Sequence, residues 1–422
     1  MNIHNENLSP DIIRKLVIFC LPLSIFALFC YPLMFLVVIS LISPLLTGVT
    51  RRFYYFALMI FIVTFFASLK PFGDLAEYLN VYKDLNANML EVFGYSRFGN
   101  GLEFMFLLFM KVIGSISNGN EQFFLVATYT LIIICLSNLI KGIDSRYQLL
   151  ILGLFFFNLG FVEVSSYFLR QVLSILIFLN AINKNRFKKW LLFIIAVTFH
   201  VSSVINIVIY LLALLLKDKK ISFVVVFLAF SSAALIFFGL LYVTPLYDIV
   251  VTKFLSVSEN DKFSTLPLNY IIMTLANIVI ILVATRKGSI YTNFEKLLFF
   301  KECFLFLILL SLPALSNRLG MIIFGFYPYF LLANFKRRSI KLDTREYIFF
   351  GVIFVINLLP FLYLMYNVSM GNNMFTFLEG KPLTANLYNI INYFAETFEK
   401  GVQYINEGNS SCQGILVIFS GY

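Results

Sequence analysis

The stretch that decides the fold runs from Ser165 to Ser203 and reads SSYFLRQVLSILIFLNAINKNRFKKWLLFIIAVTFHVSS. Two apolar runs in it are separated by the basic loop Asn183–Lys189, and basic loops between membrane spans stay in the cytoplasm. The first run contains Arg170 and the second contains His200. A cation inside a membrane segment costs at least about 2.5–3.5 kcal/mol on insertion scales, so such a side chain normally faces a partner or a wet cavity.

The two polar side chains are predicted to lie at similar depth. Arg170 is about 13 residues from the basic loop, which is about 20 Å at the helical rise. His200 is about 11 residues from the other end of that loop, which is about 17 Å. Both groups should therefore lie on the outer side of the membrane.

The composition is that of an integral membrane protein. Of the 422 residues 60% are hydrophobic and 13% are charged, and the apolar residues recur in runs long enough to span a bilayer. The net charge of +10 comes from Lys and Arg in short loops between the runs, which favours membrane topology over nucleic-acid binding. The five cysteines form no CxxC pair and the histidines do not cluster, so we expect no metal and no other cofactor.

We predict an all-α, polytopic integral membrane protein with about 11–13 transmembrane helices, some of them broken or re-entrant. Residues 1–370 should form a single membrane domain with outer loops at 70–100 and 244–267, followed by a periplasmic tail at 371–422. The run from Leu16 to Thr47 is too long for one straight span, and its three prolines allow kinks or a tight hairpin.

Two local predictions concern the polar positions. Trp190–Leu216 has basic residues at both ends, and about 27 residues are too few for two full spans. We therefore predict two half-helices that turn back near Phe199–Ser203. If the chain from Glu163 to Ser174 is one helix, Glu163 and Arg170 share a face of it.

From Lys141 onward the predicted membrane crossings are consistent with one another. Before Lys141 they are not. If 70–100 is outside, the number of crossings between residues 101 and 140 has the wrong parity. Either one segment there is re-entrant, or the charge of one loop does not indicate its true side of the membrane. The sequence leaves both explanations open.

Several short polar motifs occur in a defined order along the chain. They are Asp74-x-x-x-Tyr78-x-x-x-Tyr82, Glu103 near a glycine-rich helix start, Ser166-x-x-x-Arg170-Gln171, Phe199-His200-x-Ser202 after the basic loop, and Asn317-Arg318 before a late span. Over roughly residues 50–335 this order resembles the EpsG and Wzy family of bacterial polysaccharide polymerases. The Arg-Gln and Phe-His-x-Ser elements are the most specific. Glu103 matches loosely, because the family commonly shows a Glu-Pro-Gly-Phe-like string where this chain has Gly99-Asn-Gly-Leu-Glu103.

The resemblance implies a membrane glycosyltransferase with a GT-C-like polymerase or ligase architecture in the bacterial inner membrane. Such an O-antigen or exopolysaccharide polymerase takes a polyprenyl-pyrophosphate-linked oligosaccharide and joins it to a second lipid-linked repeat on the outer face. It would work without metal or nucleotide sugar. The expected partners are the lipid-linked oligosaccharide, membrane lipids, a flippase and a chain-length regulator.

The chemistry then assigns roles to the polar residues. A diphosphate leaving group needs cations, and arginine suits phosphate through its bidentate fork, so Arg170 is preferred over Arg318 and Arg97. His200 is the candidate base, with Glu103, Asp74 and Glu163 as competitors. The predicted catalytic residues are His200, Arg170 and Glu103. The predicted substrate-binding residues are Asp74, Tyr78, Tyr82, Arg97, Glu163, Gln171, Ser202, Asn317 and Arg318.

Structural explanations compete with these roles. Arg170 would serve equally in a buried ion pair with Glu163, His200 as a satisfied interior histidine, and the segment from Asp74 to Tyr82 as an amphipathic interfacial helix. At the level of function, a flippase for lipid-linked oligosaccharide also needs intramembrane arginines, but it should show two related halves, and no internal repeat is evident. A multi-span acyltransferase usually has a denser histidine signature than the lone His200.

Overall fold

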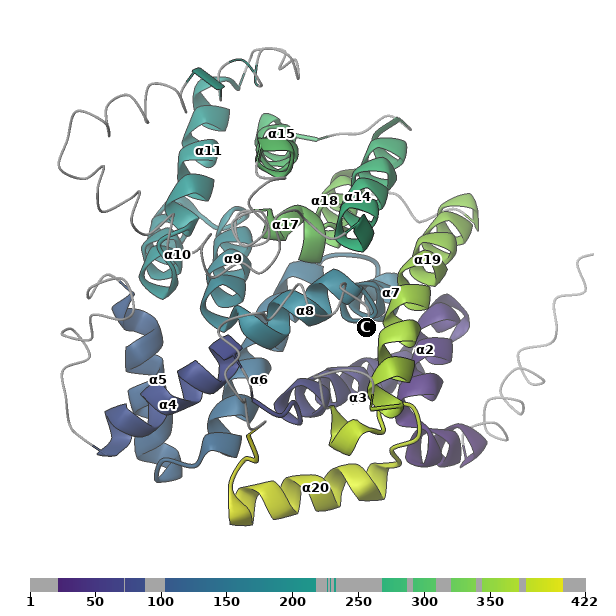
Figure 1. Ribbon diagram of the computed structural model, residues 1–422. Coiled ribbons are helices and arrows are strands. Elements are labelled where there is room, and N and C mark those ends of the chain that lie inside the picture. The colour runs from purple at the N-terminus through teal and green to yellow at the C-terminus, as the bar shows by residue number, and fades with distance from the viewer. Residues whose placement is uncertain are drawn as a thin grey trace, which may run out of the picture.

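The computed structural model describes residues 22–71, 73–87, 103–217, 226, 228, 231–232, 268–286, 291–308, 320–338, 344–371 and 377–404. Within these ranges the regular structure is helical, apart from one isolated β-bridge between Lys141 and Ile143. The all-α prediction is therefore confirmed. Figure 1 shows helices packed as a bundle, with α20 lying across one end of it.

The first part of the chain forms α2 (Pro32–Leu41), η1 (Ser43–Leu45), α3 (Gly48–Ala67), α4 (Gly73–Ala87), α5 (Phe104–Ser117), α6 (Glu121–Ile140), α7 (Ser145–Phe156), α8 (Leu159–Tyr167), α9 (Leu169–Ala181), α10 (Arg186–Phe199) and α11 (Ser203–Leu215). The second part forms α14 (Leu268–Arg286), α15 (Asn293–Ile308), α17 (Met321–Gly325), α18 (Pro328–Arg338), α19 (Thr344–Ser369), η4 (Leu378–Gly380) and α20 (Leu387–Lys400). The long proline-containing run is broken as predicted, because α2 starts at Pro32 and η1 contains Pro44.

Several helices have the length and composition of membrane spans. Among the described residues, Gly48–Ala67, Glu121–Ile140 and Tyr347–Ser369 are each long and apolar enough to cross a bilayer. Helices α7 and α8 would form a fourth crossing, bent by 65°. The protein is thus a polytopic membrane protein, while the total of about 11–13 spans stays a prediction.

The distribution of polar and apolar side chains fits a bilayer environment. Large apolar side chains point outward along the helices, for example Phe56, Ile60, Ile194 and Leu359. The interior in turn holds charged and amide side chains, among them Glu103, Asn158, Glu163, Asn206, Asn277, Lys301 and Glu302. Polar groups inside a membrane bundle are costly and mark functional or packing sites, so these residues direct attention to the interior.

One end of the bundle collects the basic loops that are predicted to be cytoplasmic. Arg51 donates from Nη1 to Ser145 Oγ at 3.3 Å, which joins the start of α3 to the start of α7. Asn180 donates to the Cys135 carbonyl at 2.8 Å and joins the last turns of α9 and α6. Helices α3 and α6 therefore run in opposite directions between two common ends.

The opposite end bears on the parity problem of the sequence. Gln122 donates to the Ala67 carbonyl at 2.9 Å, so α6 starts where α3 finishes. Tyr82 Oη and Ser117 Oγ are 2.9 Å apart, which brings α4 and the last turn of α5 to this same end. Helix α4 and the last turn of α5 thus both lie at the end where α3 finishes and α6 starts, which is what a re-entrant α5 would require.

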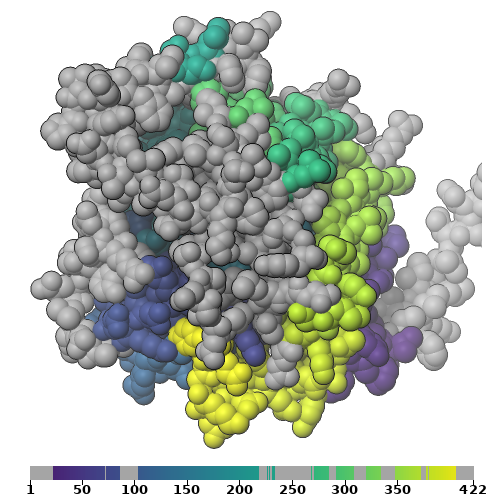
Figure 2. Space-filling view, viewed as in Figure 1, coloured from purple at the N-terminus to yellow at the C-terminus, as the bar shows by residue number. Residues whose placement is uncertain are grey.

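The chain after α19 packs back onto this end. Tyr393 in α20 donates to the Ser68 carbonyl at 3.1 Å, and Asn120 donates to the Phe398 carbonyl at 3.0 Å. The Leu378 amide donates to Ser68 Oγ at 3.0 Å. In Figure 2 the yellow atoms of α20 form the lower edge of the molecule. Part of the predicted tail therefore covers the end of the bundle where α4 and α5 meet α6.

The five-residue helix α17 lies in the interior, where its carbonyl groups need internal partners. Asn158 donates to the Gly325 carbonyl at 3.2 Å, and Asn277 donates to the Phe324 carbonyl at 3.2 Å. The backbones of α8 and α17 approach closely at Gly160, where an added Cβ would lie 2.4 Å from the Phe324 carbonyl oxygen.

This contact predicts the effect of enlarging Gly160. Because the obstacle is backbone and not a flexible side chain, Gly160→Ala should destabilise the protein by about 2–3 kcal/mol. Thermal unfolding of the detergent-purified protein measures the effect. Gly351→Ala in α19 is the matched control, since nothing lies within 4 Å of its added Cβ. Equal unfolding temperatures for the two variants would contradict the close crossing of α8 and α17.

Candidate active site

A helix break in the interior, between α10 and α11, is held in place by one serine of α9. Helix α10 ends at Phe199 and α11 begins at Ser203, as the sequence predicts. Ser174 Oγ in α9 donates to the Ala196 carbonyl at 2.6 Å and contacts Ser203 Oγ at 2.5 Å. The serine therefore holds both sides of the α10–α11 break against α9.

The reversal between α10 and α11 confirms the predicted hairpin of half-helices. Lys189 near the start of α10 donates from Nζ to Tyr210 Oη at 2.8 Å, and Tyr210 lies in the second half of α11. The chain has therefore turned back toward the basic loop. Helices of 13 and 14 residues reach about 20 Å, which is less than a bilayer core.

The condition for a shared face, one continuous helix from Glu163 to Ser174, is not met. Helix α8 ends at Tyr167 and α9 begins at Leu169, with Phe168 outside helical geometry at φ −100° and ψ 49°. The face that the sequence assigned to Glu163 and Arg170 does not extend across this break. Glu163 is fully buried, and neither of its carboxyl oxygens has a hydrogen-bond partner among the described residues.

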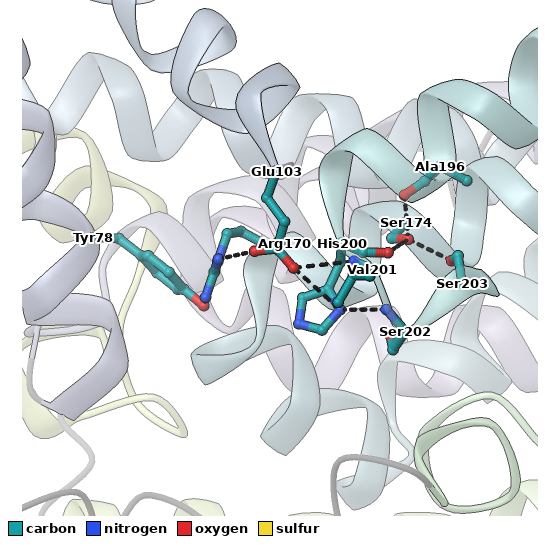
Figure 3. Close-up of polar contacts among 9 residues, drawn as sticks. All are labelled: Tyr78, Glu103, Arg170, Ser174, Ala196, His200, Val201, Ser202 and Ser203. Carbon is teal, nitrogen blue, oxygen red and sulfur yellow. Dashed lines mark hydrogen bonds and ion pairs between the residues drawn. The ribbon is translucent and has the colours of Figure 1, made fainter. Parts of the chain in front are cut away.

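Arg170 forms an ion pair with Glu103, the residue immediately before α5. Arg170 Nη1 forms an ion pair with Glu103 Oε2, and the Val201 amide donates to Glu103 Oε1 at 3.0 Å. His200 Nδ1 lies 3.8 Å from the same Oε1. Figure 3 shows the carboxylate between the guanidinium and the 200–201 backbone. One carboxylate thus joins α5, α9 and the α10–α11 break.

Exposure distinguishes the three members of this cluster. The Glu103 side chain is only 4% exposed, whereas Arg170 keeps 16% and His200 keeps 23%. A buried ion pair is stable only when hydrogen bonds satisfy the remaining polar atoms, and the Val201 amide does this for Glu103. Glu103 therefore acts as the buried anchor, while Arg170 and His200 reach the accessible side.

The backbone determines which ring nitrogen of His200 carries the proton. The Ser202 amide donates to His200 Nδ1 at 3.1 Å, so Nδ1 accepts a hydrogen bond. A neutral imidazole has one donor and one acceptor nitrogen, which puts the proton of the neutral ring on Nε2. In this state the ring is a hydrogen-bond donor through Nε2.

Helix α4 places the aromatic ring of Tyr78 beside the Arg170 guanidinium. Arg170 Nε donates to Tyr78 Oη at 3.5 Å, and the guanidinium carbon lies 5.4 Å from the Tyr78 ring centre. Asp74, one turn earlier on α4, is near enough to attract Arg170 electrostatically. Tyr82 is fully buried and stacks on Phe124 with ring centres 4.6 Å apart. Tyr82 therefore packs α4 in place, and a sugar would reach its ring only if α4 moved.

A second polar network was missed from the sequence. Lys301 and Glu302 in α15 are 6% and 0% exposed and form an ion pair. Lys301 Nζ also donates to Asn206 Oδ1 at 3.1 Å, and the Ile323 amide donates to Glu302 Oε2 at 3.3 Å. Adjacent opposite charges inside the apolar run after Lys296 were the available signal.

The remaining predicted site residues divide into two groups. Gln171 and Ser202 line a small pocket beside the cluster, together with Lys301 and Asn206. Arg97, Asn317 and Arg318 lie outside the described residues, so their roles stay predictions.

Comparison with known proteins decides the family. The model of the EpsG family matches residues 53–379, which contain every described site residue. The chain belongs to the EpsG family. Searches of curated proteins and of solved structures each gave no match. EpsG membership confirms the resemblance stated from the polar motifs, and it indicates a polysaccharide polymerase-type function in the membrane.

Proposed function

We propose that this EpsG-family protein is a polysaccharide polymerase that transfers an oligosaccharide from polyprenyl diphosphate to a second lipid-linked repeat, on the outer side of the bacterial inner membrane. The observation that supports it is the Glu103–Arg170–His200 cluster, which presents a cation and a hydrogen-bond donor inside the bundle. Phosphate oxygens are the ligands that such a pair binds best. The O-antigen and exopolysaccharide classes share this reaction.

In the proposed step the acceptor hydroxyl oxygen bonds to the anomeric carbon of the donor sugar. The bond from that carbon to the phosphate oxygen breaks, and its electron pair leaves with the lipid diphosphate. Arg170 stabilises the negative charge that develops there, and His200 donates from Nε2 to an oxygen of the same group. Glu103 positions both, because its two oxygens are held by Arg170 and by the Val201 amide.

The hydroxyl proton needs an acceptor, and the three predicted carboxyl groups differ in reach. Both oxygens of Glu103 are occupied, and Glu163 has no exposed surface. Asp74 is partly exposed on α4 beside Tyr78 and Arg170. We therefore assign the proton to Asp74 and not to His200, whose Nδ1 already accepts the Ser202 amide.

A deletion strain tests the function. Without the protein, cells should accumulate single oligosaccharide repeats on the lipid carrier and make no long polymer, and the wild-type gene should restore it. Asp74→Asn should be inserted at normal level yet lower polymer yield about 100-fold, as loss of a general base does. Mass analysis of extracted lipid-linked oligosaccharide is the measurement. Repeats confined to the cytoplasmic leaflet would overturn the polymerase assignment in favour of a flippase, whereas full activity of Asp74→Asn would remove only the proton-acceptor role.

A further inference from the structure

Helix α20 lies at the level where two membrane spans of the bundle end. Tyr393 donates to the carbonyl of Ser68, the residue directly after the span α3, at 3.1 Å. Asn120, which caps the start of the span α6, donates to the Phe398 carbonyl at 3.0 Å. Because the apolar length of a span matches the hydrocarbon core, these ends of α3 and α6 mark the boundary between lipid and water. Helix α20 therefore lies at that boundary.

The helix runs along this boundary and not through it. Figure 1 shows α20 transverse to α19 at the lower end of the bundle, and in Figure 2 its yellow atoms lie at the surface of the molecule. With 14 residues it is too short to cross a bilayer. Its apolar and polar residues are separated around the helix axis more sharply than in the spans α3, α6 and α19. This separation is typical of a helix that lies in the plane of the interface.

Only part of the apolar side of α20 is covered by the bundle. The side chains that pack inward recur at three- and four-residue spacing and are Ile390, Tyr393 and Thr397. An adjoining apolar face is exposed, with Tyr388 at 61% and Ile391 at 57%, and consists of Leu387, Tyr388, Ile391 and Phe398. The third face is exposed and polar, and consists of Asn389, Asn392, Glu396, Glu399 and Lys400. Three such faces fit a boundary with protein on one side, hydrocarbon on the second and water on the third.

The exposed apolar face continues the lipid-facing surface of the neighbouring spans. Phe123 is exposed in the first turn of α6, one turn after the Asn120 that contacts α20. Tyr366 and Met370 are exposed at the end of α19 from which the chain leads to α20. Aromatic side chains are enriched at this depth of a membrane, because their rings suit the headgroup level. Tyr388 and Phe398 of α20 therefore extend an interface that the spans already form.

We infer that α20 is an interfacial helix whose exposed apolar face is seated in the outer leaflet of the bilayer, with its polar face turned to water. Burial of apolar surface drives this contact. Attraction to anionic lipid does not, because the polar face carries two carboxylates, Glu396 and Glu399, against the single cation Lys400. The contact is independent of the reaction that the Glu103–Arg170–His200 cluster performs.

Fluorescence quenching by brominated lipid tests this contact in the full-length protein. Trp190 is the single tryptophan, so Trp190→Phe gives a background without tryptophan fluorescence. Ile391→Trp and Phe398→Trp are then introduced separately on the exposed apolar face. Asn389→Trp is the matched control, since position 389 lies about 200° around the helix axis from position 391. Each protein is reconstituted into phosphatidylcholine vesicles with or without bromine on the upper part of one acyl chain.

Bromine should lower the fluorescence of Ile391→Trp and Phe398→Trp at least about two-fold, because an interfacial helix buries its apolar face by about 5–10 Å. The fluorescence of Asn389→Trp should change little. Raising the salt concentration to about 1 M should leave the quenching unchanged, since salt screens charges and not apolar burial. Phe398→Trp exchanges one aromatic ring for another, which keeps the test available if Ile391→Trp does not fold.

Four results would overturn the seating of α20 in lipid. Equal quenching at all three positions would mean that lipid surrounds the helix. Unquenched emission at the wavelength of tryptophan in water would mean that the apolar face is free, and unquenched emission at shorter wavelength would mean that another protein copy covers it. Quenching that disappears at high salt would indicate attachment by charge. None of these results bears on polymer yield in Arg170→Ala, which tests the proposed function separately.

Discussion

Cells that carry Arg170→Ala should make no detectable long polymer, a loss of about 1,000-fold or more. Removing one donor from a site where charge develops costs about 100–1,000-fold, and here the substitution also leaves Glu103 buried without its partner. Arg170→Lys should be nearly as inactive, because an ammonium cannot hold Glu103, approach the Tyr78 ring and bind phosphate at once. Polymer length on gels, normalised to protein in the membrane, is the measurement.

The buried partner makes a structural role for Arg170 testable separately. In Arg170→Gln combined with Glu103→Gln both charges are gone, so the cost of an unpaired buried carboxylate disappears. We expect this double variant to regain the wild-type protein level and unfolding temperature while polymer stays absent. Arg146→Ala is the control, since its ion pair with Asp144 lies at the opposite end and the Arg146 side chain is 40% exposed. Polymerisation by the double variant would show that Arg170 serves only to hold Glu103.

Two substitutions of His200 should differ by about 100-fold in polymer yield, the lower end of what one hydrogen-bond donor to a developing charge contributes. Asparagine puts its Oδ1 near the position of Nδ1, so His200→Asn should keep the bond from the Ser202 amide and the helix break. It lacks any group at the position of Nε2. Glutamine carries an amide nitrogen near that position, so His200→Gln should retain far more activity than His200→Asn.

The comparison is controlled within the same turn of α10. Thr198→Val removes a hydroxyl that, among the described residues, bonds to the Ile195 and Ile194 carbonyls of its own helix, and it should leave polymer yield unchanged. Polymer yield and membrane protein level are measured for all three variants. Wild-type yield from His200→Asn would mean that the ring acts as a cap for the Ser202 amide and takes no part in the reaction.

The candidate site could be predicted from the sequence wherever the cost of a polar group in an apolar run was the signal. Arg170 and His200 stood out for this reason, and both lie in one cluster. Lys301 and Glu302 carried the same signal, because they are adjacent opposite charges inside an apolar run, but they were not among the predicted site residues. Tyr82 was given a sugar-binding role from its helical spacing, but spacing alone cannot tell an outer face from one covered by Phe124.

The sequence by itself determined the all-helical membrane architecture, the family and the reversal at residues 199–203, because apolar length and loop charge are local properties that the bilayer selects directly. Only the tertiary structure decided that Arg170 pairs with Glu103 and not with Glu163. The break at Phe168 ends the shared helix face, and the start of α5 brings in a carboxylate 67 positions away along the chain. A buried charge pairs with whichever opposite charge the packing of the helices brings next to it. That packing depends on contacts that no local sequence pattern encodes.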